Sequence, residues 1–189
     1  METFSPLLST ERLILRYFEN RDSKILFEYR NDPILSKFQG WPIPYTQDIL
    51  EDFFVSMSKR TVNTKNVWVQ IAIEDKERGV LIGDIGYHND GEKVELGITL
   101  RAEFQSQGYA TEALSDFIRY LVRELKIHRF VAIIDAENSS SIALFERLGF
   151  RQEGFHLKSF WNKIIGDWRD EYLYAMLDSE VKGNCSSSQ

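Results

Sequence analysis

A loop with a single glycine, Gln105-Ser106-Gln107-Gly108-Tyr109-Ala110, stands between an expected strand that ends at Leu100 and an expected helix that begins near Tyr109. The first N–H groups of a helix have no partner within the helix, and the helix dipole places about half a positive charge at that end. Glycine lets a phosphate approach the backbone closely, or lets the chain adopt a positive φ. The spacing favours an anion site here, although Gly108 could serve only to turn the chain into the helix.

A second polar segment precedes another expected helix, between Asn138 and Phe150. Asn138 is suited to cap the helix, because its side-chain oxygen can accept from the N–H group of Ser141. Apolar residues follow at helical spacing, and Gly149 is suited to end the helix. Taken alone, this segment predicts a well-capped structural helix.

These two segments must be positioned by an alternation of strands and helices. Apolar residues at offsets of 3, 4, 7, 8, 11, 12 and 15 from Ala110 form one helical stripe that reaches Leu125. The hairpin signal Asn89-Asp90-Gly91 lies within an antiparallel meander, and a wholly apolar run at 130–134 is typical of a strand buried on both faces. The sequence therefore predicts a mixed α/β protein. The expected strands cover 12–17, 67–73, 80–87, 94–100, 130–134, 150 onward and 172–177, and the expected helices cover 22–30, 46–60, 109–125 and 138–148.

Composition and spacing exclude several classes of protein. The chain has 189 residues and a net charge of −6, which argues against a nucleic-acid binder that relies on excess cation. The single cysteine, Cys185, rules out an internal disulfide and a Cys-rich zinc site, and we expect no metal. The loop at Gly108 lacks the Gly-Lys-Ser/Thr and Gly-x-Gly-x-x-Gly patterns, so nucleotide loops of those kinds are unsupported.

The length and the ends of the chain favour one domain over residues 1–180, followed by a flexible Ser-rich tail at 181–189. No signal peptide is visible at the start, and no apolar run approaches 18 residues. We therefore expect a cytoplasmic protein that has no membrane partner and is a monomer or a homodimer.

The ordered set of motifs resembles the GNAT superfamily of acetyl-CoA-dependent N-acetyltransferases. The pattern Gln-x-x-Gly-x-Ala is followed about 30 residues later by Asn-x-x-Ser-x-x-Leu-Phe-Glu-x-x-Gly-Phe. The RimJ/RimL-type branch is similar in three further places: the opening Ser9-Thr10-Glu11-Arg12-Leu13-Ile14-Leu15-Arg16, the segment Glu95-Leu96-Gly97, and the ending Asp170-Glu171-Tyr172-Leu173-Tyr174-Ala175-Met176-Leu177. This resemblance implies a mostly antiparallel mixed sheet of six to seven strands with helices on both faces, splayed between two central strands.

The resemblance also implies how acetyl-CoA would be held. Its pyrophosphate would rest on the backbone N–H groups of 107–110, and its pantetheine arm would lie along the strand that ends at Leu100. A backbone N–H near Ile98 would stabilise the tetrahedral oxyanion, and Asn138 would bond a pantetheine amide. The implied cofactor contacts are Ile98, Leu100, Gln105, Gln107, Gly108, Tyr109, Ala110, Thr111, Asn138 and Phe145.

A primary amine must lose a proton to attack, so a general base is expected. Glu95 is the first candidate, because it lies on the strand face opposite Ile98 and three residues before it. Glu95 could also be an ordinary solvent-facing glutamate, and His88, His128 and His156 are weaker candidates. Direct attack is favoured, because no cysteine lies near these motifs.

The group that protonates the leaving thiolate stays open. Many members of the superfamily have Tyr where this chain has Phe145. Here Ser141, Tyr109 or water would supply the proton, or the thiolate would leave without one. Ser141 is retained as the second catalytic candidate.

The acceptor is also open. A protein N-terminal α-amine is favoured, and spermidine or another small amine is an alternative within the same chemistry. An alternative of another class is a catalytically silent acyl-CoA-binding module, which Phe145 makes conceivable.

Overall fold

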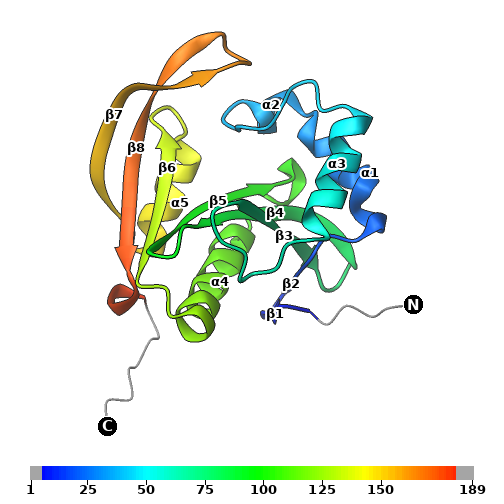
Figure 1. Ribbon diagram of the computed structural model, residues 1–189, viewed down its shortest axis with the longest axis horizontal. Helices are drawn as coiled ribbons and strands as arrows, with labels where there is room; N and C mark the ends of the chain where they lie inside the picture. The colour runs from blue at the N-terminus through cyan, green and yellow to red at the C-terminus, as the bar shows by residue number, and fades with distance from the viewer. Residues whose placement is uncertain (1–5, 182–189) are drawn as a thin grey trace.

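The computed structural model describes residues 6–181, which form one eight-stranded sheet in the order β1-β2-β3-β4-β5-β6-β8-β7 (Figure 1). Only β5 and β6 pair in parallel, so the sheet is mixed and mostly antiparallel, as predicted. The eighth strand is the short β1, which the sequence did not indicate. The strands are β1 Leu8–Ser9, β2 Leu13–Arg16, β3 Trp68–Asp75, β4 Val80–Asn89, β5 Lys93–Leu100, β6 Arg129–Asp135, β7 Arg151–Asn162 and β8 Asp167–Leu177.

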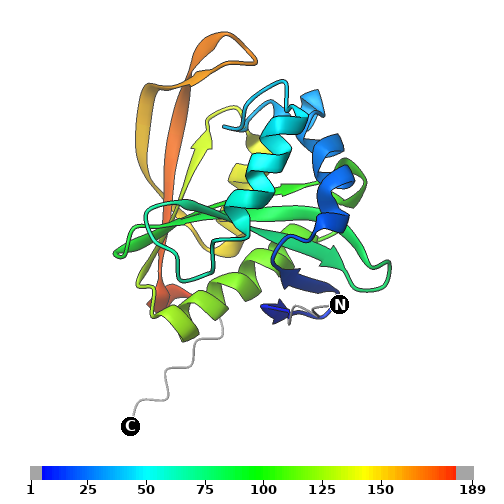
Figure 2. The same cartoon turned by 45° about the vertical axis from the view of Figure 1, so that its right-hand side comes forward.

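Helices cover both faces of the sheet, also as predicted. Helices α4 and α5 pack on one face in a core that includes Ile71 and Phe130, whereas α1 and α3 pack on the other face around Ala72 and Leu81. Figure 2 shows α4 running past the strands β1 and β2 near the N-terminus. The helices are α1 Ser23–Arg30, α2 Pro33–Ser36, α3 Gln47–Met57, α4 Tyr109–Leu125 and α5 Ser139–Leu148, with 3-10 turns η1 Asn20–Asp22, η2 Ala102–Phe104 and η3 Asp178–Glu180.

The ends of these helices follow from local chemistry. Thr46 caps α3 by accepting from the N–H group of Ile49, and Asn138 caps α5 by accepting from that of Ser141. Gly149 ends α5 with a φ of 99°, a conformation that favours glycine. The short helix α2 was not predicted, although it has a regular start with Asp32 as its cap and a proline at its first position.

The sheet opens between β5 and β6, which confirms the expected splay. The two strands pair only over Lys93–Glu95 and Arg129–Val131, although β5 continues to Leu100 and β6 to Asp135. β4 stays paired with β5 as far as Leu100, and β8 stays paired with β6 as far as Asp135. Each half of the sheet is therefore continuous, and the opening lies between the halves.

The expected tail at 181–189 lies outside the described residues except for Val181, and so does Cys185. Within residues 6–181 no helix is long and apolar enough to cross a membrane. No cluster of three or more metal-ligating side chains occurs in that same part of the chain.

Candidate active site

A cleft of about 1100 Å³ adjoins the opening between β5 and β6. The last three residues of β5, the loop before α4, and the first turns of α4 and α5 line one part of it. The helix α2 and the residues just after it line another part, through Ile34, Leu35, Phe38 and Gln39. Glu11 and later turns of α4 and α5 also contribute to the lining. The cleft thus joins segments that are far apart in the sequence.

The structure brings most of the predicted cofactor residues together in this cleft. The predicted residues that line it are Ile98, Leu100, Gln105, Gly108, Tyr109, Ala110, Thr111 and Asn138, and the catalytic candidate Ser141 lines it as well. Two predicted cofactor residues do not line the cleft. The side-chain amide of Gln107 donates to the carbonyl oxygen of Glu103 at 2.7 Å. The Phe145 ring is 2% exposed and packs edge-on against Phe150 in the core, with ring centroids 5.0 Å apart.

The start of α4 has the features of an anion site. Gly108 is the N-cap residue with a φ of 83°, and no side chain caps the first turn. The first N–H groups of the helix therefore have no side-chain cap, and they lie at the positive end of the helix dipole. A Cβ atom added to Gly108 would lie 3.4 Å from Nη2 of Arg12, so a side chain there would press against the arginine.

A network from the N-terminal segment supports this loop. Arg12 donates to Oε2 of Glu112 at 2.7 Å and to the carbonyl oxygen of Gln107 at 3.0 Å. Thr10 donates to Oε1 of Glu112 at 2.5 Å, and the backbone N–H of Arg12 donates to the same atom at 2.8 Å. Burial opposes ionisation of Glu112, but these hydrogen bonds hold its pKa below the ordinary value.

This network was not predicted from the sequence. Thr10 and Arg12 belong to a segment that resembles the RimJ/RimL-type branch, but its residue spacing does not indicate a contact with α4. Their partner Glu112 lies about 100 residues away in the sequence.

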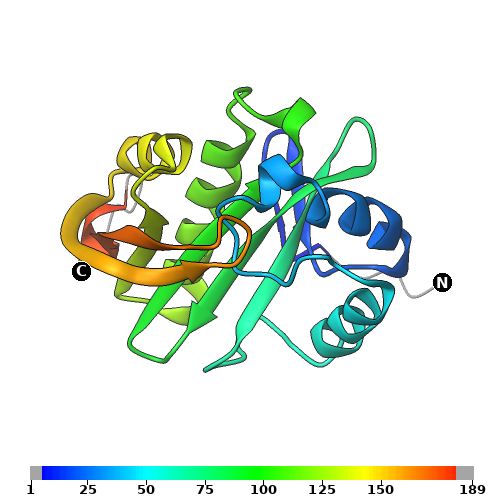
Figure 3. The same cartoon turned by 90° about the horizontal axis from the view of Figure 1, so that it is seen from above.

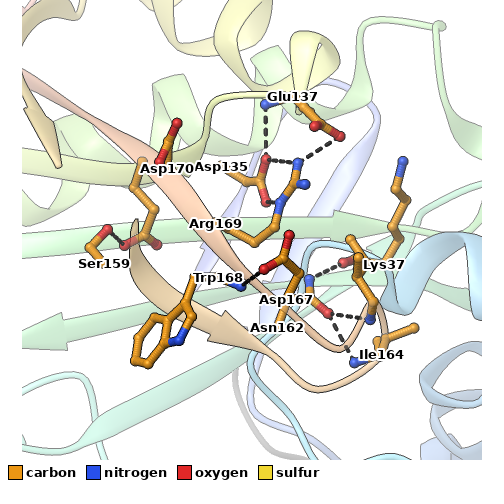
Figure 4. Close-up of polar contacts among 12 residues, drawn as sticks. Lys37, Asp135, Glu137, Ser159, Asn162, Ile164, Asp167, Trp168, Arg169 and Asp170 are labelled. Carbon is orange, nitrogen blue, oxygen red and sulfur yellow. Dashed lines mark hydrogen bonds and ion pairs between the residues drawn. The ribbon is translucent and has the colours of Figure 1, made fainter. Parts of the chain in front are cut away.

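A second network fixes the loop between β6 and α5. Arg169 donates to both carboxylate oxygens of Asp135 at 2.9 and 3.1 Å and forms an ion pair with Glu137 at 2.6 Å (Figure 4). The backbone N–H of Asn138 donates to the carbonyl oxygen of Asp135 at 2.8 Å. Asn138 and Ser141 are therefore held from strand β8 as well as from their own helix.

The hydroxyls of Tyr109 and Ser141 are the two side-chain candidates for protonating the leaving thiolate, and their surroundings differ. The hydroxyl of Tyr109 donates to Oδ2 of Asp75 at 3.2 Å, and the Tyr109 side chain is buried. Both residues line the cleft, but within residues 6–181 the Ser141 hydroxyl has no side-chain partner of this kind. Of the two hydroxyls, that of Tyr109 is engaged with Asp75.

Glu95 lies at the point where the opening begins. It is the last β5 residue that pairs with β6, and it is opposite His88 on β4. Its side chain is half-buried, and burial raises its pKa; the charge of Glu171 adds to this, while His88 and Lys93 oppose it. Glu95 does not line the cleft.

The three histidines do not line the cleft either. His88 is half-buried, with its ring centroid 5.8 Å from that of Trp68. His128 is exposed, with Nδ1 3.0 Å from Asp178, and His156 is exposed on β7.

The geometry suits acetyl-CoA. The cleft is large, no side chain caps the helix N-terminus beside it, and Gly108, which has no side chain, is part of the lining there. Beyond Glu95, β5 has no pairing with β6, which leaves room for an extended amide chain alongside it.

Comparison with known proteins matches residues 12–151 to a family model described as an acetyltransferase (GNAT) domain. An uncharacterised N-acetyltransferase of Bacillus subtilis, YnaD, is 33% identical and covers 92% of this chain and 98% of its own. The Escherichia coli enzyme that acetylates an alanine of ribosomal protein uS5 is 26% identical over 89% of each chain. The structure of a spermidine N-acetyltransferase from Vibrio cholerae, in complex with CoA and spermine, is similar in fold, with a TM-score of 0.78 and 21% identity over 90% of this chain and 98% of that one.

Proposed function

The chain belongs to the GNAT acetyltransferase family and is an acetyl-CoA-dependent N-acetyltransferase, and from that premise we propose that its acceptor is the α-amino group of a protein N-terminus. The relative that acetylates an alanine of a ribosomal protein supports this choice, because the similarity covers 89% of each chain. An α-amino group has a pKa of about 7.7–8.0, so a substantial fraction is neutral and able to attack near pH 7.

The lining of the cleft is the observation that carries the proposal. We assign the acceptor to the α2 end, because the other end holds the anion site. The lining at the α2 end is apolar or neutral, from Ile34, Leu35, Phe38 and Gln39. A peptide N-terminus brings one amine and an adjoining side chain, which suits such a lining.

The carboxylates that line the cleft lie elsewhere. Glu112 is ion-paired with Arg12, Asp116 is ion-paired with Arg119, and Glu11 adjoins Arg12 in the N-terminal segment. A polyamine carries several positive charges and would need carboxylates at the acceptor end. This difference favours the α-amine.

Residues of this chain would have the following roles in the reaction. The first N–H groups of α4 hold the pyrophosphate, Asn138 bonds the pantetheine arm, and a backbone N–H near Ile98 faces the carbonyl oxygen. Acetyl-CoA, when bound, supplies the thioester carbonyl that the amine attacks. As the C–N bond forms and the C–S bond breaks, Glu95 accepts the amine proton through water, because it lies outside the cleft lining. Ser141 relays a proton from solvent to the leaving sulfur, so its hydroxyl ends neutral.

A polyamine is the second candidate acceptor. The charge of Glu171 contributes to the raised pKa of Glu95, and two neighbouring carboxylates suit a cation, although neither of them lines the cleft. The alternative of a catalytically silent module is not adopted. It depended on Phe145, whose ring packs in the core and does not line the cleft.

Calorimetry and a thiol-release assay test the proposal together. Calorimetry should show acetyl-CoA binding, and release of free CoA should be faster with peptides beginning in alanine or serine than with spermidine. The same peptides with a blocked N-terminus serve as controls and should give no release. If acetyl-CoA binds but CoA is released faster with spermidine than with the peptides, the acceptor is a polyamine and not an α-amine. Release of CoA with blocked peptides would contradict N-terminal acetylation.

A further inference from the structure

The tip of the β7–β8 hairpin lies beside the segment that follows α2, as the view from above shows (Figure 3). The contact is a hydrogen bond of 2.7 Å from the side-chain amide Nδ2 of Asn162 to the carbonyl oxygen of Lys37. These residues are 125 positions apart in the sequence. The bond therefore joins the last hairpin of the sheet to the N-terminal helices.

Both polar atoms of the Asn162 side chain form hydrogen bonds (Figure 4). Its side-chain oxygen Oδ1 accepts from the backbone N–H groups of Ile164 and Ile165 at 2.9 and 3.0 Å, which fixes the turn of the hairpin. The residue is 1% exposed, although its neighbours in the tip are exposed. Both the nitrogen and the oxygen of this buried amide have partners, so the position requires a side chain that can donate and accept.

The carbonyl oxygen that accepts this hydrogen bond belongs to Lys37, at the end of α2. Lys37 is the C-cap of α2, and the last carbonyl groups of a helix have no partner within the helix. Leu35 precedes it and Phe38 and Gln39 follow it, and all three line the cleft at the end assigned to the acceptor. A helix of four residues has little stability of its own, so an external bond at its end matters.

The hairpin is also anchored at the other side of the cleft. Arg169 on β8 is bound to Asp135 and Glu137, in the loop that carries Asn138. The backbone N–H of Ala136 donates to the carbonyl oxygen of Asp170 at 2.9 Å. The hairpin thus connects the α2 wall of the cleft with the wall formed by α5.

We infer that Asn162 is a positioning residue for the acceptor, because it holds the segment from Leu35 to Gln39 in the conformation that forms the acceptor end of the cleft. The inference rests on the proposed function, and it assigns acceptor affinity to a residue that does not itself line the cleft. The acetyl-CoA end is supported separately by Arg12 and Glu112. Loss of the Asn162 bond should therefore affect one substrate and not the other.

The variant Asn162→Asp isolates this bond. It keeps an oxygen for the N–H groups of Ile164 and Ile165, and it replaces the donor to Lys37 by an oxygen that repels the carbonyl group. Lys163→Ala is the matched control, because Lys163 is an exposed neighbour in the same tip. Asn162→Ala serves as a second variant if the aspartate variant unfolds.

Steady-state kinetics should show the split. With a decapeptide that begins in alanine, Asn162→Asp should raise the KM for the peptide about tenfold and leave the KM for acetyl-CoA within about twofold. Lys163→Ala should match the wild type. Equal changes in both KM values, or an unchanged KM for the peptide, would overturn the inference.

Hydrogen exchange separates this inference from the proposed function. In Asn162→Asp, exchange should quicken in the segment 34–39 and stay unchanged in α4. If the peptide is not acetylated at all but exchange quickens, the kinetics are repeated with spermidine, and the same split in KM is required. Unchanged exchange at 34–39 in a folded variant would refute the role of Asn162 whatever the acceptor is.

Discussion

Arg12 donates to the carbonyl oxygen of Gln107 at 3.0 Å, and this bond ties the start of the chain to the loop before α4. The Arg12 side chain is 41% exposed, so its ion pair with Glu112 adds little to the free energy of unfolding. Its effect should instead appear in the position of the loop.

We predict that Arg12→Ala raises the KM for acetyl-CoA about five- to tenfold and changes the melting temperature little. Arg12→Lys should restore only part of the affinity, because lysine keeps the charge but cannot bond Gln107 and Glu112 in the same planar geometry. The control is Arg123→Ala, which removes an exposed arginine paired with Glu124 farther along α4. Equal acetyl-CoA affinity in Arg12→Ala and Arg123→Ala would show that the network has no role in binding.

Gly108→Ala should weaken acetyl-CoA binding and destabilise the protein. At a φ of 83° a Cβ atom costs about 1–2 kcal/mol, and it would also approach Arg12. Gly79→Ala is the control for the backbone cost, because Gly79 has a φ of 64° with open space around its Cβ position. Both variants should melt earlier, and only Gly108→Ala should lose affinity in calorimetry. Gly108→Asp adds a negative charge beside the phosphates and should abolish binding.

Glu95→Gln should lower kcat about a hundredfold or more without changing acetyl-CoA affinity. A carboxylate accepts a proton only when it is ionised, so the wild-type rate should rise with pH through the raised pKa of Glu95. The variant should lose that limb of the pH–rate profile and keep the limb of the acceptor amine. Glu92→Gln, an exposed neighbour in the same hairpin, should behave as wild type. A Glu95→Gln profile identical to that of the wild type would exclude Glu95 as the base.

The same substitution predicts a pH-dependent gain in stability. Burial raises the pKa of Glu95 in the folded protein, so ionising it costs folding free energy. That cost is absent below the ordinary glutamate pKa, grows as pH rises between the unfolded and folded pKa values, and is complete above the folded value. Glu95→Gln should therefore be more stable than the wild type at pH 7 and similar to it near pH 3. Denaturant unfolding at both pH values measures the difference.

Ser141→Ala should lower kcat about tenfold if its hydroxyl protonates the leaving sulfur, with Ser140→Ala, also in the cleft lining, as the control. Phe145→Tyr tests the other candidate position. Because the ring is buried against Phe150, the added hydroxyl should cost about 1–3 kcal/mol of stability and give no increase in kcat. An increase in kcat for Phe145→Tyr would show that position 145 reaches the reacting groups.

Local patterns predicted the parts of the fold that depend on neighbouring residues. The meander β3–β4–β5, the apolar stripe of α4 and the Asn138 cap each follow from contacts within a few residues, and all are present. Strand β8 begins at Asp167, five residues before the predicted start. Its first five residues are charged except for Trp168 and lack an alternating apolar pattern, so the sequence did not indicate them. Helix α2 is too short for its periodicity to be recognised.

The local features of the candidate cleft could be predicted from the sequence, whereas the contacts that join distant segments could not. The loop at Gly108 has a glycine whose conformation matters and a helix start, which are both local. The bonds from Arg12 to Glu112 and from Asn162 to Lys37 join segments about 100 and 125 residues apart. Helical spacing also places Phe145 one turn after Ser141, and only the packing shows that Phe145 faces the core.

The separation of Arg12 from Glu112 also has a consequence for how the protein acquires its shape. Closing a loop of 100 residues costs more entropy than closing the short turns of the meander, so contacts of this kind form later. During synthesis the N-terminal segment emerges first and must wait for α4, while β3, β4 and β5 pair with their immediate neighbours. The end of the cleft beside the α4 N-terminus is therefore expected to form among the last parts of the fold.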